Sequence, residues 1–291
     1  MSSPKKAQAY ALLAGITWGF SGTIAAYLPT EIGSLTIAAF RLFLGGLFLL
    51  AYQAKNVRHL MKAPRESLPT LFISALALVS TQACFFSAVS RIGVGLSTMI
   101  YIGSSPLFAG ILERLTDKVP LSGKWFRSVL FTLVGSVILG AVNWDGLTAP
   151  SGLLYALGAG LSWSTTGLTM KRLQKYKGSL EVTTQVMVLS GLMILPLLSG
   201  ANWPVILTAP AIPPLLLLGL LTASIPYALY NLAVKTIPAG HAIVLGMSEP
   251  LTAALLGILL LGEPATPLHL LGYALIFTGV LLLYLSPKAD S

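Results

Sequence analysis

The sequence is poor in charged residues and has little cysteine or histidine. Only 9% of its 291 residues are charged, against about 25% in a typical soluble domain, so it has too little polar surface to cover a water-soluble globule. Its single cysteine, Cys84, cannot form an internal disulfide. It also lacks a P-loop and a catalytic constellation, so we expect no enzyme, no ATP-driven pump and no cofactor. The histidines are scattered and predict no metal site: His59, His241 and His269.

Long apolar runs dominate what is present. Apolar residues make up 55% of the chain, in runs close to the ~20 residues that cross ~30 Å of hydrocarbon. The first run follows two lysines, as in a signal peptide, but it is longer than a signal core, so we expect it to remain as a span. The runs predict ten membrane-spanning helices, at residues 8–28, 35–53, 68–89, 94–112, 126–142, 151–170, 182–200, 212–233, 240–261 and 267–286.

The net charge of +9 could suggest a nucleic-acid partner. The basic residues, however, lie in short segments between apolar runs, without a basic face interleaved with aromatic residues, which argues against nucleic acid. If the ten runs cross the membrane in turn, all of the Lys and Arg residues except Arg41 and Arg91 fall on one side. Because basic loops stay in the cytoplasm, this predicts an even number of spans and two cytoplasmic termini.

The second half of the chain repeats the first. Residues 14–22 (AGITWGFSG) match residues 159–167 (AGLSWSTTG) at an offset of 145. Residues 104–106 (SSP) match residues 248–250 (SEP) at an offset of 144. Several matches in the same order at nearly one offset are hard to obtain by chance. We therefore predict two five-helix repeats, at residues 7–142 and 151–286.

An odd number of spans in each repeat means that the second copy enters the membrane from the opposite side. Arg91 and Lys235 occupy matching positions, and the charge pattern puts the first outside and the second inside. This is an inverted-topology repeat, in which a site between the halves can open alternately to each side. The inversion is the strongest argument from the sequence for transport.

Polar and aromatic residues deep in the expected spans are candidates for a substrate site, because such groups are costly in a bilayer. Glu249 lies near the middle of the ninth span, where a carboxylate costs roughly 2.5–3.5 kcal/mol; it could meet substrate or serve helix packing alone. Trp18 and Trp163 occupy equivalent places, where they could hold substrate or fill the core. The other candidate substrate-binding residues are Gln82, Met99, Tyr101, Tyr227, Tyr230, Asn231 and Ser248. This neutral, amphipathic set suits small zwitterions with apolar side chains.

Three prolines lie inside expected spans: Pro106, Pro226 and Pro250. Each removes the N–H that the carbonyl four residues earlier would bind, so each predicts a kink that either bends during gating or only shapes packing. His241, at the start of the ninth span, could act in gating or be a polar residue at a helix end. Arg41 could extend to the membrane interface or meet a carboxylate of the substrate or protein.

The ten spans, the five-plus-five repeat, the A-G-x-[ST]-W segments at 14–18 and 159–163 and the S-E-P at 248–250 resemble the drug/metabolite transporter superfamily, in its EamA-type branch. Within this branch the chain looks similar to the YddG-type bacterial amino-acid exporters. The resemblance covers nearly the whole chain and implies a basket-like bundle with a central cavity, lined chiefly by the third, fourth, eighth and ninth spans. The residues that it favours as cavity lining are Trp18, Gln82, Tyr101, Trp163, Tyr227 and Glu249.

We therefore expect an all-α membrane protein of the bacterial cytoplasmic membrane, working as a monomer in contact with lipid. The leading hypothesis is export of aromatic and other neutral amino acids by alternating access. A drug or metabolite exporter with the same fold is the alternative, and a non-transporting scaffold or receptor is the alternative of another class. The sequence leaves open whether transport is coupled to protons.

Overall fold

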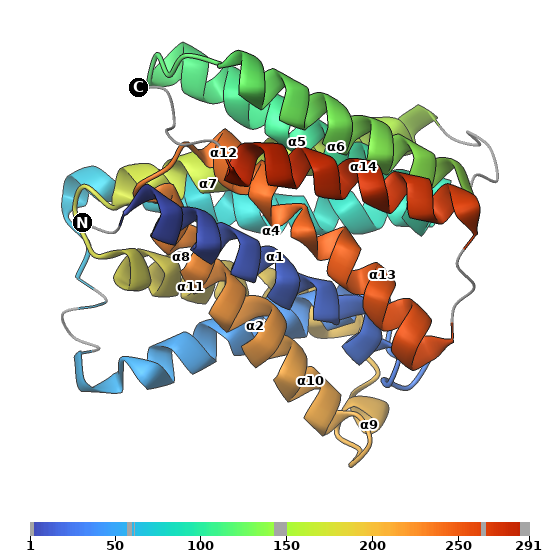
Figure 1. The fold of residues 1–291 in the computed structure, drawn as a ribbon. Coiled ribbons are helices and arrows are strands. Elements are labelled where there is room, and N and C mark those ends of the chain that lie inside the picture. The colour runs from blue at the N-terminus through green and yellow to red at the C-terminus, as the bar shows by residue number, and fades with distance from the viewer. Residues whose placement is uncertain (1–2, 57–59, 61, 143–149, 263–265, 286–291) are drawn as a thin grey trace.

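A computed structural model describes residues 3–56, 60, 62–142, 150–262 and 266–285, and these residues form helices and no strand (Figure 1). His59 and the connection between the two expected repeats lie outside the described residues. The helices of the first half are α1 (Pro4–Ala25), α2 (Ser34–Tyr52), α4 (Leu68–Ile92), α5 (Val94–Thr116) and α6 (Gly123–Val142). Those of the second half are α7 (Pro150–Leu173), α8 (Ser179–Ile194), α9 (Trp203–Ile206), α10 (Ile212–Gly219), α11 (Ile225–Val234), α12 (Ala239–Gly246), α13 (Ser248–Leu261) and α14 (Pro267–Tyr284).

Helical segments occupy each of the ten ranges that the apolar runs predict. Not all of them reach the length and hydropathy of a membrane span. The Gly, Ser and Thr residues of α7, for example, make it less apolar, and many of them are buried inside the bundle. In the part of the chain that is described, five helical stretches are long and apolar enough to cross a membrane: Ser34–Tyr52, Arg65–Ile92, Ile212–Val234, Ala239–Leu260 and Pro267–Tyr284.

Two of the three prolines lie beside interruptions of their helices. A π-helical turn, Leu220–Ser224, separates α10 from α11 just before Pro226. Met247 separates α12 from α13, three residues before Pro250. Because proline clashes with the preceding turn, a wider turn or a break relieves the strain. Pro106, by contrast, lies inside α5, which continues through it.

Long-range packing joins the two halves of the chain. Helix α1 packs against α11, α12 and α13, and α7, its counterpart, packs against α4 and α5. One close glycine contact occurs in both halves of the chain, at positions related by the repeat. A Cβ added to Gly15 would lie 2.1 Å from Ser248 Oγ and 2.4 Å from the Gly246 carbonyl oxygen, and one added to Gly160 would lie 2.3 Å from Ser104 Oγ. Only glycine permits backbones to approach this closely, so the duplicated sequence builds the same crossing twice.

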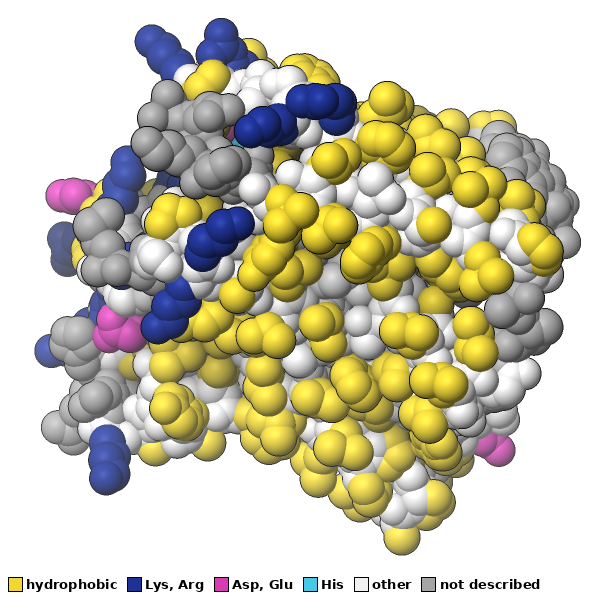
Figure 2. Space-filling model, viewed as in Figure 1, with side chains coloured by type: hydrophobic (Ala, Val, Ile, Leu, Met, Phe, Trp, Pro, Cys, Tyr) yellow, Lys and Arg dark blue, Asp and Glu magenta, His cyan; other side chains and the backbone are white. Residues whose placement is uncertain are grey.

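Charge is concentrated at one end of the molecule. On the face drawn in Figure 2, Lys and Arg side chains gather at one end and apolar side chains cover most of the remainder. The N-terminus of α1 and the C-terminus of α14 lie together at this end (Figure 1), where Lys5 Nζ donates a hydrogen bond of 2.5 Å to the Tyr284 carbonyl oxygen. We call it the basic end and the opposite one the far end. Leu154, Leu255 and Leu259 are 60–74% exposed, an apolar surface suited to contact with lipid.

Candidate functional site

A cavity of about 520 Å³ lies between the two halves of the chain. Small-molecule sites commonly measure roughly 300–1,000 Å³. Helix α1 begins at the basic end, and the part of it that lines the cavity, Trp18 to Ala25, runs from the middle of the helix to its far end. Helix α2 contributes its first half, Ser34 to Arg41. The cavity therefore extends from the middle of the molecule toward the far end.

Four aromatic side chains form a cluster at the inner limit of this cavity: Trp18, Trp163, Tyr227 and Tyr230. The Trp18 and Trp163 ring centroids lie 5.3 Å apart in an edge-to-face arrangement, and Trp18 is 5.5 Å from Tyr227. Tyr230 lies 5.2 Å from Trp163. All four line the cavity. Aromatic pairs contribute about 0.5–1.5 kcal/mol each beyond area burial, so the four rings form a stable surface, which we call the aromatic floor of the cavity.

The walls above the aromatic cluster are largely apolar, with a few neutral polar groups. Phe85 lies 5.5 Å from Tyr101 and 5.3 Å from Phe86, and all three rings line the cavity. Gln82 lies one turn before the two phenylalanines on α4 and also lines it. An apolar wall with a small number of polar groups is typical of a site for a small organic molecule.

Two residues of opposite charge line the same cavity. Arg41, on α2, donates from Nη1 to Ser21 Oγ at 3.1 Å. Its Nε is buried and has no acceptor among the described residues. Glu249, at the start of α13, forms no ion pair or hydrogen bond through its carboxylate in the part of the chain that the structure describes. Its counterpart in the first half, Ser105, donates to the Tyr101 carbonyl oxygen at 2.6 Å.

Seven of the ten predicted substrate residues meet at the cavity: Trp18, Gln82, Tyr101, Trp163, Tyr227, Tyr230 and Glu249. The structure places the other three elsewhere. Asn231 is fully buried and donates to the Ser179 carbonyl oxygen at 2.8 Å and to Thr183 Oγ1 at 2.9 Å. Ser248 donates to the Leu12 carbonyl oxygen at 2.9 Å. Met99 is half-buried on α5 outside the cavity lining.

The residues proposed for gating or kinks are spread out. Pro250 lines the cavity, whereas Pro106 and Pro226 do not. His241 is half-buried in the first turn of α12. Phe85 and Phe86 were not predicted as lining residues, and for Arg41 contact with a substrate carboxylate was only one of the alternatives. Their signals were present: one charge in an apolar run, and two rings at the helical spacing that shares a face with Gln82.

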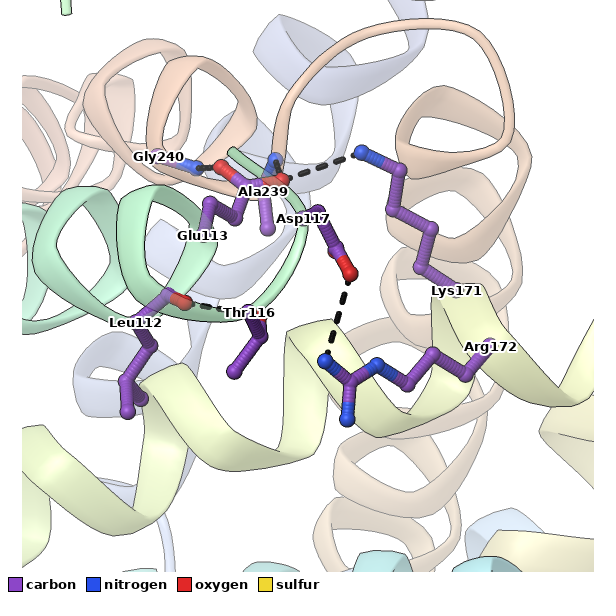
Figure 3. A network of polar contacts seen from close by, with 8 residues as sticks. All are labelled: Leu112, Glu113, Thr116, Asp117, Lys171, Arg172, Ala239 and Gly240. Atoms are coloured by element: carbon purple, nitrogen blue, oxygen red, sulfur yellow. Dashed lines mark hydrogen bonds and ion pairs between the residues drawn. The ribbon is translucent and has the colours of Figure 1, made fainter. Parts of the chain in front are cut away.

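Polar contacts join helix ends at the basic end (Figure 3). The Glu113 carboxylate, 2% exposed, accepts hydrogen bonds from Lys171 Nζ at 3.0 Å and from the backbone N–H groups of Ala239 at 2.8 Å and Gly240 at 3.0 Å. It thus holds α5 to α7 and to the N-terminus of α12, where a negative charge is favourable. Beside it, Arg172 and Asp117 form a more exposed ion pair at 3.2 Å. We call these six residues the α5–α7–α12 cluster.

Comparison with known proteins gives a consistent result. The model of the EamA-like transporter family matches the chain twice, over residues 5–141 and 150–285. The uncharacterized transporter YwfM of Bacillus subtilis (strain 168) is 32% identical over 96% of this chain and 94% of its own length. The threonine/homoserine exporter RhtA of Escherichia coli (strain K12) is 27% identical over 82% of this chain and 78% of its own. A solved crystal structure with 16% identity has a TM-score of 0.81 over 96% of both chains, which shows a shared fold.

These matches and the apolar helices make the chain a multi-pass membrane protein. Its relatives are named as transporters, so it is a transporter and not an enzyme. The resemblance to the drug/metabolite transporter superfamily is confirmed. Since the family model covers both halves, the chain belongs to the EamA-like transporter family.

Proposed function

We propose that this protein exports neutral amino acids, aromatic ones among them, from the bacterial cytoplasm by alternating access. One observation carries the proposal: the cavity joins an aromatic floor to walls with neutral polar groups and two opposite charges. Such a lining suits a zwitterion with an apolar side chain. The similarity to RhtA, whose name specifies threonine and homoserine, supports neutral amino acids as the class. Because one chain encloses the cavity, we propose that the monomer is the working unit.

We further propose that ten spans form two inverted five-helix repeats, with the basic end and both termini in the cytoplasm. The ten helical segments and the repeated glycine crossings support this arrangement. The gathering of Lys and Arg at one end supports the orientation, because positive loops are retained in the cytoplasm (Figure 2). The cavity then faces outward.

Counterpart positions on the two sides of the aromatic cluster differ as alternating access requires. At Gly22, which lines the cavity, an added Cβ would meet no atom within 4 Å. At Gly167, 145 residues later, it would lie 2.5 Å from Tyr230 Oη. Ala25 lines the cavity, whereas its counterpart Met170 is fully buried. This difference supports an outward-open state in which the inner half of the pathway is closed.

Counterflow in liposomes tests the proposed function. Purified protein is reconstituted into vesicles loaded with unlabelled amino acids, and entry of labelled phenylalanine or threonine is followed against protein-free vesicles. We expect saturable counterflow that other neutral amino acids inhibit. The absence of counterflow across a broad amino-acid panel would contradict the proposal, and flux of cationic dyes in its place would favour a drug exporter.

A further inference from the structure

The two charged side chains of the cavity stand apart from its otherwise neutral lining. Arg41 comes from α2 and Glu249 from α13, so they reach the cavity from different halves of the chain. Both residues are described, and no ion pair within 4.0 Å joins them. The two groups act on each other electrostatically without forming an ion pair, so their hydrogen-bonding capacity remains available to a third group in the cavity.

Neither charge has an ion-pair partner among the described residues. The Nε–H of Arg41 is buried without an acceptor, although buried donors are nearly always bonded. The Glu249 carboxylate has no bonded partner among the described residues. Charged groups at membrane depth are costly and generally mark substrate or ion pathways. A helix-packing role would be expected to provide each group with a partner in the protein.

We infer that Arg41 and Glu249 together bind the two charges of a zwitterionic substrate and so determine its class. The guanidinium group receives the α-carboxylate, for which its planar donors are suited, and the Glu249 carboxylate receives the α-ammonium group. The inference rests on the proposed function and deepens it. It predicts that both charges of the substrate are required, and that compounds bearing only one are poor substrates.

The surroundings of Arg41 also orient the substrate. Its Nη1 is held by Ser21 Oγ at 3.1 Å, and Ser21 in turn donates to the Trp18 carbonyl oxygen at 2.6 Å. The guanidinium group is thus fixed about one helical turn to the far-end side of Trp18. A substrate held by its charges at this level directs its side chain onto the aromatic cluster. Tight selection falls on the charged groups, and the broad aromatic floor accepts side chains of different shapes.

Competition in the counterflow assay tests the inference with four probes. Phenylalanine carries both charged groups. Phenylalaninamide and phenethylamine lack the carboxylate, and 3-phenylpropanoate lacks the ammonium group. In the wild type, we expect phenylalanine to compete roughly 10- to 100-fold better than any of the others, the value of one charged hydrogen-bonded contact. Arg41→Gln should abolish the preference over phenethylamine and phenylalaninamide but retain that over 3-phenylpropanoate. Glu249→Gln should do the reverse. Arg91→Gln, an exposed arginine outside the cavity lining, is the matched control and should keep both preferences.

The pattern of losses separates the possible results. If both variants weaken all four probes equally, or neither changes the order of preference, the assignment is overturned while the exporter remains. If the wild type carries no amino acid, the proposed function itself fails. A variant too impaired for flux is examined by titrating the probes against tryptophan fluorescence, since Trp18 and Trp163 line the cavity. The same selective change in probe preference is required there, and its absence overturns the assignment.

Discussion

Glu113 offers the sharpest test of how the basic end is closed. Its carboxylate is 2% exposed and accepts hydrogen bonds from three donors on two other helices. If the inner half of the pathway opens there, these bonds must break. We therefore expect Glu113→Gln to favour the inward-open state at the expense of the outward-open one.

The size of the effect follows from burial. Removing one partner of a buried ion pair typically costs about 3–5 kcal/mol, but the Lys171 side chain is 28% exposed, so water can solvate part of the charge left behind. The glutamine oxygen keeps one backbone donor, so the lower end of that range applies. About 3 kcal/mol corresponds to a change of roughly 150-fold in the ratio of the two states. Asp117→Asn breaks the neighbouring ion pair, whose side chains are 38% and 33% exposed, and an exposed pair of this kind contributes about 0–1 kcal/mol, or at most roughly fivefold.

Cysteine accessibility measures the ratio of states. In a background with Cys84→Ala, one cysteine is introduced either at Ala25, in the cavity, or at Met170, its buried counterpart. Aqueous thiol reagents should modify the first quickly and the second slowly. Adding Glu113→Gln should accelerate modification at position 170 by up to roughly 150-fold and slow it at position 25, while Asp117→Asn changes both little.

Three results would contradict this reasoning. If Glu113→Gln leaves both modification rates unchanged in a protein that still melts cooperatively, the α5–α7–α12 cluster does not hold the basic end closed. A lower melting temperature with unchanged rates would mean that the cluster only supports the fold. Equal effects of the Glu113 and Asp117 variants would mean that burial of the carboxylate is not the source of its strength.

Three further predictions concern packing. Gly19→Ala should lower stability by about 1–3 kcal/mol in thermal melts, because overpacking forces the backbones apart and its Cβ would lie 2.6 Å from Thr252 Cβ; Gly123→Ala, which meets no atom within 4 Å, should not. Trp18→Ala should lower the free energy of unfolding by about 3–5 kcal/mol and abolish counterflow. Trp18→Phe keeps a ring in the aromatic cluster and should retain counterflow. Asn231→Ala should destabilise the protein by about 1–3 kcal/mol for each buried partner left unsatisfied, yet leave the KM of the remaining active protein unchanged; a raised KM would instead indicate substrate contact.

The length of the apolar runs was sufficient to locate the long helices but not the short α9, which lies between two expected ranges. Helix α4, Leu68–Ile92, matches the expected range of 68–89 closely. The interruptions were harder to predict, because proline strain can be absorbed in several ways: Pro226 follows a π-helical turn, whereas Pro106 leaves its helix continuous. The outcome depends on which neighbouring helix can satisfy the freed backbone groups. Ser224, whose hydroxyl donates to the Gly45 carbonyl oxygen at 2.9 Å, fastens the π-helical turn to α2.

The candidate site was predictable where symmetry or spacing carried the information. Trp18 and Trp163 were paired by the repeat, and their rings are in contact. Asn231 shares a helix with Tyr227, but it lies deeper toward the basic end, against Ser179 and Thr183 of α8. Spacing on one helix gives the face of a residue and not its depth relative to other helices. Glu113 was missed for a similar reason, since its backbone partners lie more than 120 residues away in the sequence.

The contact between Trp18 and Trp163 has a consequence for the origin of the protein. Under the inverted arrangement, each tryptophan packs against its own copy. An ancestral chain of five helices, inserted in both orientations, would have formed the same contact between identical residues of an antiparallel homodimer. Gene fusion would then have released the two copies from the requirement to stay identical, and Glu249, whose counterpart in the sequence is Ser105, is a position where they differ. Co-expressing residues 1–148 and 149–291 as separate polypeptides would recreate such a dimer in a form whose halves can be altered independently.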